Sequence, residues 1–204
     1  LDAALGLVAL RGALMQAMPS GAMLSVSLDE AAASAYVGGE VSLAAVNSPN
    51  ACVLSGPHAA IAAVREKLEA AGAGCRPLMT SHAFHSAMMQ PMIADFTAAV
   101  RRAAPKAPSR PYVSNLTGGG MAAADAVDPD YWAKHLLGCV RFRQGMETLL
   151  AGGCSYFIEI GPGNVLSTFA RHAINAAKSA AAVVQTVRHP KEAKADALVL
   201  RQAL

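Results

Sequence analysis

The sequence is poor in aromatic and charged residues and has no long apolar segment. Hydrophobic residues make up 53% of the 204 residues, and alanine inflates that figure. No uninterrupted apolar run approaches the roughly 18–20 residues that cross a bilayer. The segment from Leu1 onward also lacks the charged start, apolar run and cleavage site of a secretory signal. We therefore predict a cytoplasmic protein with no membrane partner.

Two further absences exclude other classes of protein. The 17 Lys and Arg residues are scattered without interleaved aromatic residues, so nucleic acid is not an expected partner. The net charge of +3 instead suits an acidic carrier protein or the phosphates of a coenzyme. No C-x-x-C pair occurs, so no metal site is predicted, and buried free thiols are expected. The cysteines are Cys52, Cys75, Cys139 and Cys154.

The first 78 residues predict a helix followed by a small sheet. Apolar residues at near-helical spacing predict a helix over 1–18, which ends at the turn Pro19-Ser20-Gly21. Short apolar strands and two helical patterns follow in the order β-α-β-β-α-β, which is typical of a ferredoxin-like unit. The strands are expected at 23–26, 42–46, 52–54 and 76–78, and the helices at 28–36 and 59–71.

The rest of the sequence alternates strands and helices, which predicts an α/β layer into which the small unit is inserted. Asp128-Pro129 predicts a capped helix start. The apolar run Tyr156 to Ile160 predicts a buried parallel strand. Helices are also expected at 89–103, 144–150 and 165–177, and strands at 112–115 and 182–187.

Two histidines, His82 and His85, stand in a predicted loop between a strand and a helix. Histidine is suited to proton transfer near neutral pH, although an isolated histidine is more often a surface or hydrogen-bonded structural residue. A metal site would need a third ligand, which is not evident nearby. The run His82-Ala83-Phe84-His85 resembles the motif that ends in the catalytic histidine in acyltransferases of modular polyketide synthases. That motif is associated with malonyl rather than methylmalonyl units.

The resemblance implies roles for these residues. His85 would be the general base, His82 would belong to the substrate-binding motif, and Phe84 would fill the space that an α-methyl group needs. Excluding one methyl group is worth only about 1–3 kcal/mol, so a preference rather than absolute selection is implied.

Other segments resemble the same family in the same order along the chain. Within Val8 to Met15, Arg11 matches the arginine that binds the malonyl carboxylate, for which a planar guanidinium is suited. Asn115 matches the residue whose backbone carbonyl orients the catalytic histidine. The turn Gly161 to Asn164 is open to two interpretations, an anion site at a helix start or a structural turn. Further matching segments are 46–50, 53–56, 131–136, 140–142 and 158–166.

The resemblance also implies the fold class and its division. The chain would be the C-terminal part of an α/β-hydrolase-like malonyl transacylase core with an inserted ferredoxin-like βαββαβ subdomain. Residues 1–20 and 80–187 would belong to the large α/β subdomain, and residues 21–79 to the small one. Residues 188–204 would be the linker that follows acyltransferase domains in modular synthases.

The implied function is transfer of a malonyl unit from malonyl-CoA, through a malonyl-serine, to the phosphopantetheine thiol of an acyl carrier protein. This is a step of polyketide antibiotic biosynthesis with no tightly bound cofactor. The 204 residues contain no G-x-S-x-G nucleophile elbow, so the chain is expected to supply the base and the arginine but not the serine. Its expected partners are the carrier protein, an adjacent ketosynthase and the missing N-terminal part, and alone it is predicted to be inactive.

Two alternatives remain open at this point. The chain could be a non-catalytic docking module of a polyketide synthase, or part of a stand-alone malonyl transacylase of fatty-acid synthesis. The matches at His85, Arg11 and Asn115 favour an enzyme, because a scaffold need not retain them. The paired histidines and the tail Arg188 to Glu192 favour a synthase domain.

Overall fold

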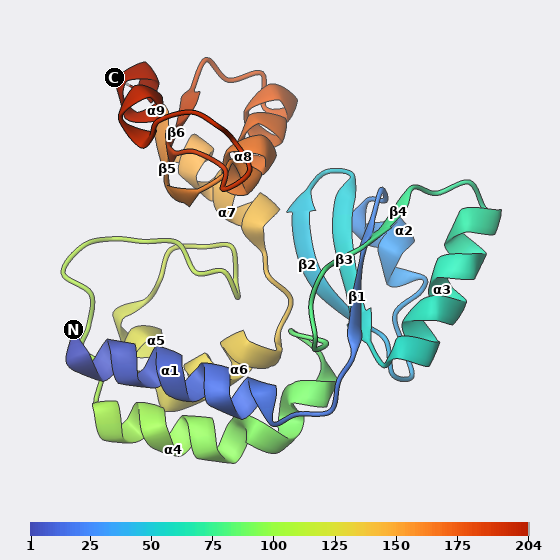
Figure 1. The fold of residues 1–204 in the computed structure, drawn as a ribbon. Coiled ribbons are helices and arrows are strands. Elements are labelled where there is room, and N and C mark those ends of the chain that lie inside the picture. The colour runs from blue at the N-terminus through green and yellow to red at the C-terminus, as the bar shows by residue number, and fades with distance from the viewer. Residues whose placement is uncertain (204) are drawn as a thin grey trace.

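Three groups of elements make up the computed structural model, which describes residues 1–203 (Figure 1). Helices α1, α4, α5 and α6 lie together at the bottom of the view. A small sheet with α2 and α3 lies to the right, and strands β5 and β6 with α7, α8 and α9 lie at the top. The chain enters the small sheet from α1 and returns from it to α4.

The predicted elements occur in the predicted order, except that no strand forms at residues 112–115, and the structure adds two helices that were not predicted, α5 and α9. The helices are α1 (Asp2–Gln16), α2 (Glu30–Ser34), α3 (His58–Ala70), the 3-10 helix η1 (Ala87–Met92), α4 (Ile93–Ala103), α5 (Ala123–Val127), α6 (Pro129–Leu137), α7 (Phe142–Ala151), α8 (Val165–Ala176) and α9 (Asp196–Ala203). The strands are β1 (Ala22–Val26), β2 (Ser42–Ser48), β3 (Ala51–Gly56), β4 (Cys75–Pro77), β5 (Tyr156–Pro162) and β6 (Ala182–Val187).

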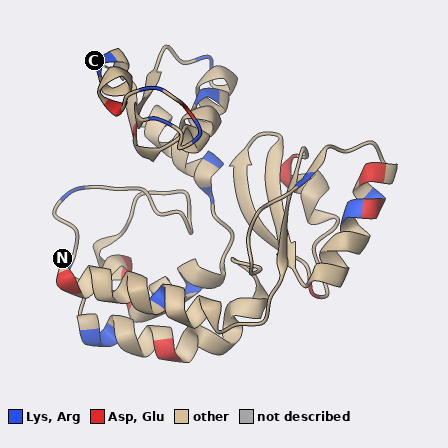
Figure 2. Cartoon of the chain, viewed as in Figure 1, with Lys and Arg blue, Asp and Glu red and all other residues tan. Residues whose placement is uncertain are grey.

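The small sheet has the strand order β2-β3-β1-β4, and all of its neighbouring strands are antiparallel. This is the ferredoxin-like arrangement that the sequence predicts. Its core combines Leu24 and Leu54 of the sheet with Ile61 and Leu68 of α3. The apolar residues of α3 lie three and four positions apart, so they share the face that packs on the sheet. On the solvent-exposed side of α3, Arg65 and Glu69 form an ion pair at 2.6 Å, and Figure 2 shows acidic and basic positions next to each other along this helix.

The helices of the large part pack around a cluster of methionines. Met15 of α1 lies against Met89, Met92 and Leu136. The predicted start of α6 is confirmed, because the Asp128 carboxylate accepts a hydrogen bond from the Asp130 N–H at 2.9 Å and Pro129 follows it. This packing sets the position of α1 over α4, which matters below because α1 carries Arg11.

The predicted strand at 112–115 is wrong. Only an isolated bridge between Val113 and Gly120 forms there. Pro111 has no N–H to donate, and the chain turns back at once, since the Gly118 N–H donates to the Ser114 carbonyl at 2.8 Å. The segment is therefore too short to build a ladder.

The strand at 156–160 is parallel to β6 as predicted, but it is not buried. Tyr156, Ile158 and Ile160 are 79%, 61% and 87% exposed. Phe157, whose side chain points to the opposite face, packs against α7 and α8. Within residues 1–203 nothing covers the other face, whereas parallel sheets in proteins are normally covered on both.

The structure also bears on the predicted buried free thiols and on the length and apolar character of the helices. The cysteines are free, as predicted, but only Cys52 is fully buried and Cys154 is exposed. Burial raises the pKa of the Cys52 thiol to about 11, which keeps it protonated. Across the part of the chain that the structure describes, no helix has the length and apolar character of a membrane span.

Candidate active site

The loop Thr80 to Ser86 brings His85 to the junction of the small sheet and the large helices. Ser86 caps η1 by accepting a hydrogen bond from the Met88 N–H at 3.2 Å, and its hydroxyl donates to the Ala83 carbonyl at 2.6 Å. His85 itself has φ of +55°, a left-handed conformation that is uncommon outside glycine. Backbone conformations of this kind persist where the surroundings impose them, and they concentrate at functional sites.

The His85 ring is held by a backbone carbonyl. Its Nδ1 lies 3.0 Å from the carbonyl oxygen of Gly138. A carbonyl oxygen only accepts, so Nδ1 carries the proton, and in the neutral ring Nε2 keeps a free lone pair. Burial lowers the pKa of His85 to about 4; the hydrogen bond to Gly138 opposes this shift, and His135 and Arg11 add to it. At neutral pH the ring is therefore ready to accept a proton at Nε2.

This contact corrects the role predicted for Asn115. The Asn115 carbonyl accepts the Arg141 N–H at 2.7 Å, while Gly138 orients His85. Gly138 ends α6 in an extended conformation, which turns its carbonyl out of the helix. A side chain at this position would place its Cβ 2.6 Å from the Leu116 side chain, so glycine fits where larger residues would clash. A glycine directly after a predicted helix was the available sequence signal.

Arg11 and Phe84 share a cavity with His85. The cavity has a volume of about 370 Å³. Its other lining residues are Val8, Gly12, Met15 and Met23. Phe84 packs against both the cluster of Met15 and that of Met23, so it forms a fixed wall between the helices and the small sheet. The structure thus brings the predicted base, the predicted carboxylate ligand and the predicted selectivity residue into one site.

Arg11 has unused hydrogen-bonding capacity in this site. Its Nε is buried and has no hydrogen-bond partner among residues 1–203. Burial lowers the pKa of the guanidinium, whose ordinary value lies so high that it stays charged. A buried donor without a partner costs free energy, and a carboxylate would satisfy it with charge-assisted hydrogen bonds. A second, apolar cavity of about 360 Å³ lies between α1, α4 and α6 and also includes Arg11 in its lining.

His82 does not contact this cavity, which corrects its predicted place in substrate binding. The side chain is only 5% exposed, and both ring nitrogens are already used. Nε2 lies 3.0 Å from the Met18 carbonyl and Nδ1 lies 2.7 Å from the Ser81 hydroxyl. No ring nitrogen of His82 is left to hydrogen-bond a substrate.

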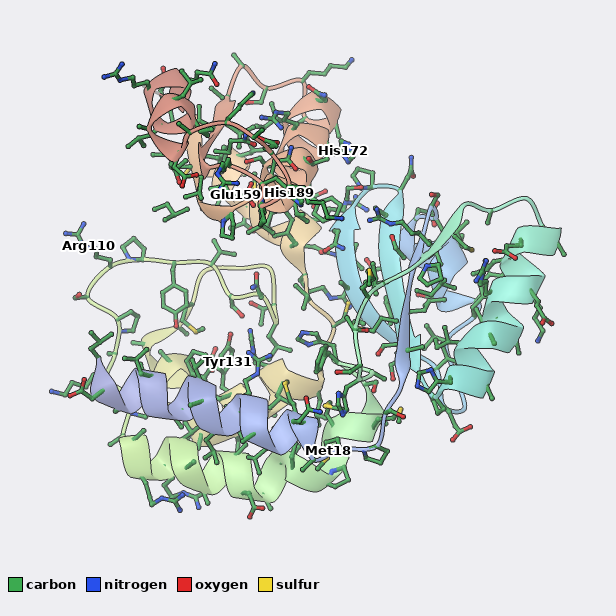
Figure 3. The ribbon with its side chains drawn as sticks, viewed as in Figure 1. Met18, Arg110, Tyr131, Glu159, His172 and His189 are labelled. Atoms are coloured by element: carbon green, nitrogen blue, oxygen red, sulfur yellow. The ribbon has the colours of Figure 1, made fainter. Side chains whose placement is uncertain are left out.

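The turn after β5 is a structural one. The Glu159 carboxylate accepts hydrogen bonds from the Leu166 and Ser167 N–H groups at 3.1 and 2.8 Å. Glu159 thus occupies the N-terminus of α8, where an anion would otherwise bind, and its position near the turn is seen in Figure 3. An anion site at Gly161 to Asn164 is therefore not supported. Gly161 and Pro162 still belong to β5, and the chain turns toward α8 at Gly163, which has φ of +94°. Among the described residues, no cluster of three His, Cys, Asp or Glu side chains could hold a metal ion.

A family model described as "Acyl transferase domain" matches residues 1–203. The chain belongs to this family. It is 37% identical over 167 residues to a phenolphthiocerol/phthiocerol polyketide synthase of Mycobacterium tuberculosis, covering 82% of the chain and 11% of that protein. It is 39% identical to polyketide synthase GfsA of Streptomyces halstedii, covering 91% of the chain and 2% of that protein.

Solved acyltransferase structures share the fold. The acyl transferase domain of SpnD, in complex with 2-(pent-4-yn-1-yl)malonyl, superposes with a TM-score of 0.94 at 34% identity, over 99% of this chain and 49% of that one. MCAT from Streptococcus pneumoniae gives a TM-score of 0.79 at 29% identity, over 98% and 65%. These findings confirm the predicted resemblance to acyltransferase domains of modular polyketide synthases and the predicted fold class. The chain spans about half the length of the synthase acyltransferase structure and a small part of the whole synthases.

Proposed function

We propose that this chain is the part of a malonyl-CoA:acyl carrier protein acyltransferase that supplies the general base and the carboxylate ligand, in polyketide synthesis. The observation that carries the proposal is the shared cavity, which neutral His85 lines together with Arg11, whose buried Nε has no hydrogen-bond partner among residues 1–203. A base and a fixed cation in one cleft suit transfer of an acyl group that ends in a carboxylate.

In the proposed reaction His85 moves one proton in each half. Nε2 takes the proton of a serine hydroxyl as its oxygen attacks the thioester carbonyl of malonyl-CoA, and then gives it to the departing CoA sulfur. The carrier's phosphopantetheine thiol next gives its proton to Nε2 and attacks the malonyl-serine, and the serine oxygen recovers that proton. The Gly138 carbonyl stabilises the transient imidazolium through Nδ1, and Arg11 holds the malonyl carboxylate throughout.

The serine would come from the other half of an acyltransferase domain. Three observations support this part of the proposal: the 204 residues contain no G-x-S-x-G, the chain spans 49% of the SpnD domain, and the apolar face of β5 is uncovered. The division into a large subdomain (1–20 and 80–187), a small one (21–79) and a linker (188–204) belongs to the same proposal, as do a carrier protein and a ketosynthase as partners.

Labelled malonyl-CoA tests the proposal directly. The 204-residue chain alone is expected to show no covalent malonyl-serine. A complete domain, formed by adding an acyltransferase N-terminal half with its serine, is expected to form the adduct and pass it to a carrier protein. Rapid labelling of the chain alone would overturn the assignment of the serine to the other half. A complete domain that forms no adduct would support a docking module instead.

Replacing Phe84 with serine in the complete domain is expected to raise the ratio of methylmalonyl to malonyl transfer by roughly tenfold. The smaller side chain opens the cavity wall beside His85, where an α-methyl group would otherwise meet the ring. The measurement is kcat/KM for both coenzyme A esters. Phe84→Leu, which keeps most of the bulk, serves as the matched control. An unchanged ratio in the serine variant would remove Phe84 as the selecting residue.

A further inference from the structure

The two connections between the large helices and the small sheet run side by side. The outgoing connection joins α1 to β1, and the return connection leads from β4 to η1. The Gly21 N–H donates to the Ser81 carbonyl at 3.2 Å, and the Leu78 N–H donates to the Met23 carbonyl at 2.9 Å. A Cβ on Gly21 would lie 2.7 Å from the Ala83 Cβ, so the two backbones approach as closely as glycine allows.

His82 ties these two connections together with its side chain. Nε2 donates to the Met18 carbonyl at 3.0 Å, because a carbonyl only accepts, and in the neutral ring Nδ1 then accepts from the Ser81 hydroxyl at 2.7 Å. Met18 lies just past the end of α1, where the connection begins (Figure 3). The His82 ring also stacks on Phe84, with the ring centroids 6.2 Å apart. One buried side chain thus joins the end of α1, its own loop and the wall of the cavity.

We infer that His82 is a positioning residue that clamps the two connections and thereby fixes the Arg11 helix against the His85 loop. Arg11 lies on α1, seven residues before Met18, and His85 lies three residues after His82 on the loop. A shift of the junction therefore changes the distance between the carboxylate ligand and the base. It would also move Phe84, which both the helices and the small sheet contact. The inference rests on the proposed function for its catalytic consequence, but the clamp itself is a property of the fold.

The loss of the clamp is expected to act on turnover more than on affinity. Displacing a catalytic group by about 1 Å can cost 10²-fold in rate. In the complete domain, His82→Phe keeps a ring beside Phe84 but removes both hydrogen bonds, and we expect kcat to fall by about 10–10²-fold with a smaller change in KM. His82→Gln retains an amide that can donate to the Met18 carbonyl, and we expect it to recover most of that loss.

Amide hydrogen exchange tests the clamp without reference to activity. His82→Phe is expected to speed exchange in residues 18–24 and 78–86, including the Gly21 N–H that donates to Ser81, and to leave α3 unchanged. His172→Ala, at an exposed histidine of α8, is the matched control and should change neither exchange nor rate. Rates are compared per folded molecule, so that lower stability alone does not count as support.

The outcomes separate the two proposals. An inactive wild-type complete domain would overturn the proposed function, while the exchange comparison still decides whether His82 clamps the junction. An active wild-type domain with unchanged kcat in His82→Phe would refute the positioning role. Faster exchange confined to the two connections, lower kcat and recovery in His82→Gln would together support it.

Discussion

Replacing His85 with alanine in the complete domain is expected to lower kcat/KM for malonyl transfer by about 10²–10⁴-fold, the usual contribution of a general base. Gly138 holds Nδ1, so Nε2 is the ring nitrogen left to accept a proton, and His85 lines the cavity together with Arg11. The measurement is the rate of malonyl-serine formation in a single turnover, which isolates the step in which the serine proton is removed. Malonyl-CoA binding should change little.

Two control variants distinguish loss of the general base from loss of the folded structure. His85→Asn fits the left-handed backbone at φ +55° better than alanine does, and its amide can still donate to the Gly138 carbonyl, yet it cannot take up a proton. It should therefore fold like the wild type and be as slow as the alanine variant. His58→Ala, at an exposed histidine of α3, should keep full activity. Wild-type rates in His85→Asn would exclude His85 as the base.

The pH dependence of malonyl-serine formation tests the direction in which the His85 pKa is shifted. Burial lowers its pKa to about 4, so the neutral form that accepts a proton predominates at every pH above that value. The rate should be flat between pH 8 and about 5 and should fall as pH drops through about 4. A limb centred on the ordinary histidine pKa of about 6.5 would contradict a buried base. The limb should be absent in His85→Asn.

The sequence predicts well whatever depends on periodicity and local turn chemistry. The spacing of residue types predicts three features of the fold. These are the strands and helices of the βαββαβ unit, the capped start of α6 at Asp128 and the loop that carries His85. Each of these features depends on side chains that are close in the sequence, within one or two turns of the same element, so distant contacts are not needed to predict it. The order of the elements, and the α/β layer with an inserted βαββαβ unit, could therefore be inferred, whereas the malonyl transacylase core was implied by the family resemblance.

The parts that the sequence could not reveal depend on which backbone groups meet across the fold. The carbonyl that orients His85 belongs to Gly138, 53 residues away, and no side-chain pattern indicates where a carbonyl points. His82 resembles a substrate ligand in the sequence, and only its two hydrogen bonds show otherwise. The apolar strand β5 resembles a buried strand in the sequence, but among the described residues one of its faces is uncovered. This exposure agrees with the proposal that the other half of the domain packs there.

Replacing Arg11 with alanine is expected to lower kcat/KM for malonyl-CoA by about 10²–10³-fold, because a desolvated carboxylate loses its cationic partner. Acetyl-CoA has no carboxylate, so its slow transfer should be unchanged or faster, since a neutral acyl group leaves the Arg11 Nε without a partner in the wild type. The ratio of malonyl to acetyl transfer is the quantity to measure, because a general loss of folding lowers both rates equally.

Two matched variants complete the Arg11 experiment. Arg11→Lys keeps the charge but not the planar fork, so it should recover only part of the malonyl rate. Arg65→Ala removes a surface arginine whose ion pair with Glu69 is solvent-exposed, and it should leave both rates unchanged. A malonyl to acetyl ratio that stays at the wild-type value in Arg11→Ala would show that another cation binds the carboxylate. Among the described residues that line the cavity with His85, Arg11 is the only charged side chain, so that cation would then have to come from outside this lining.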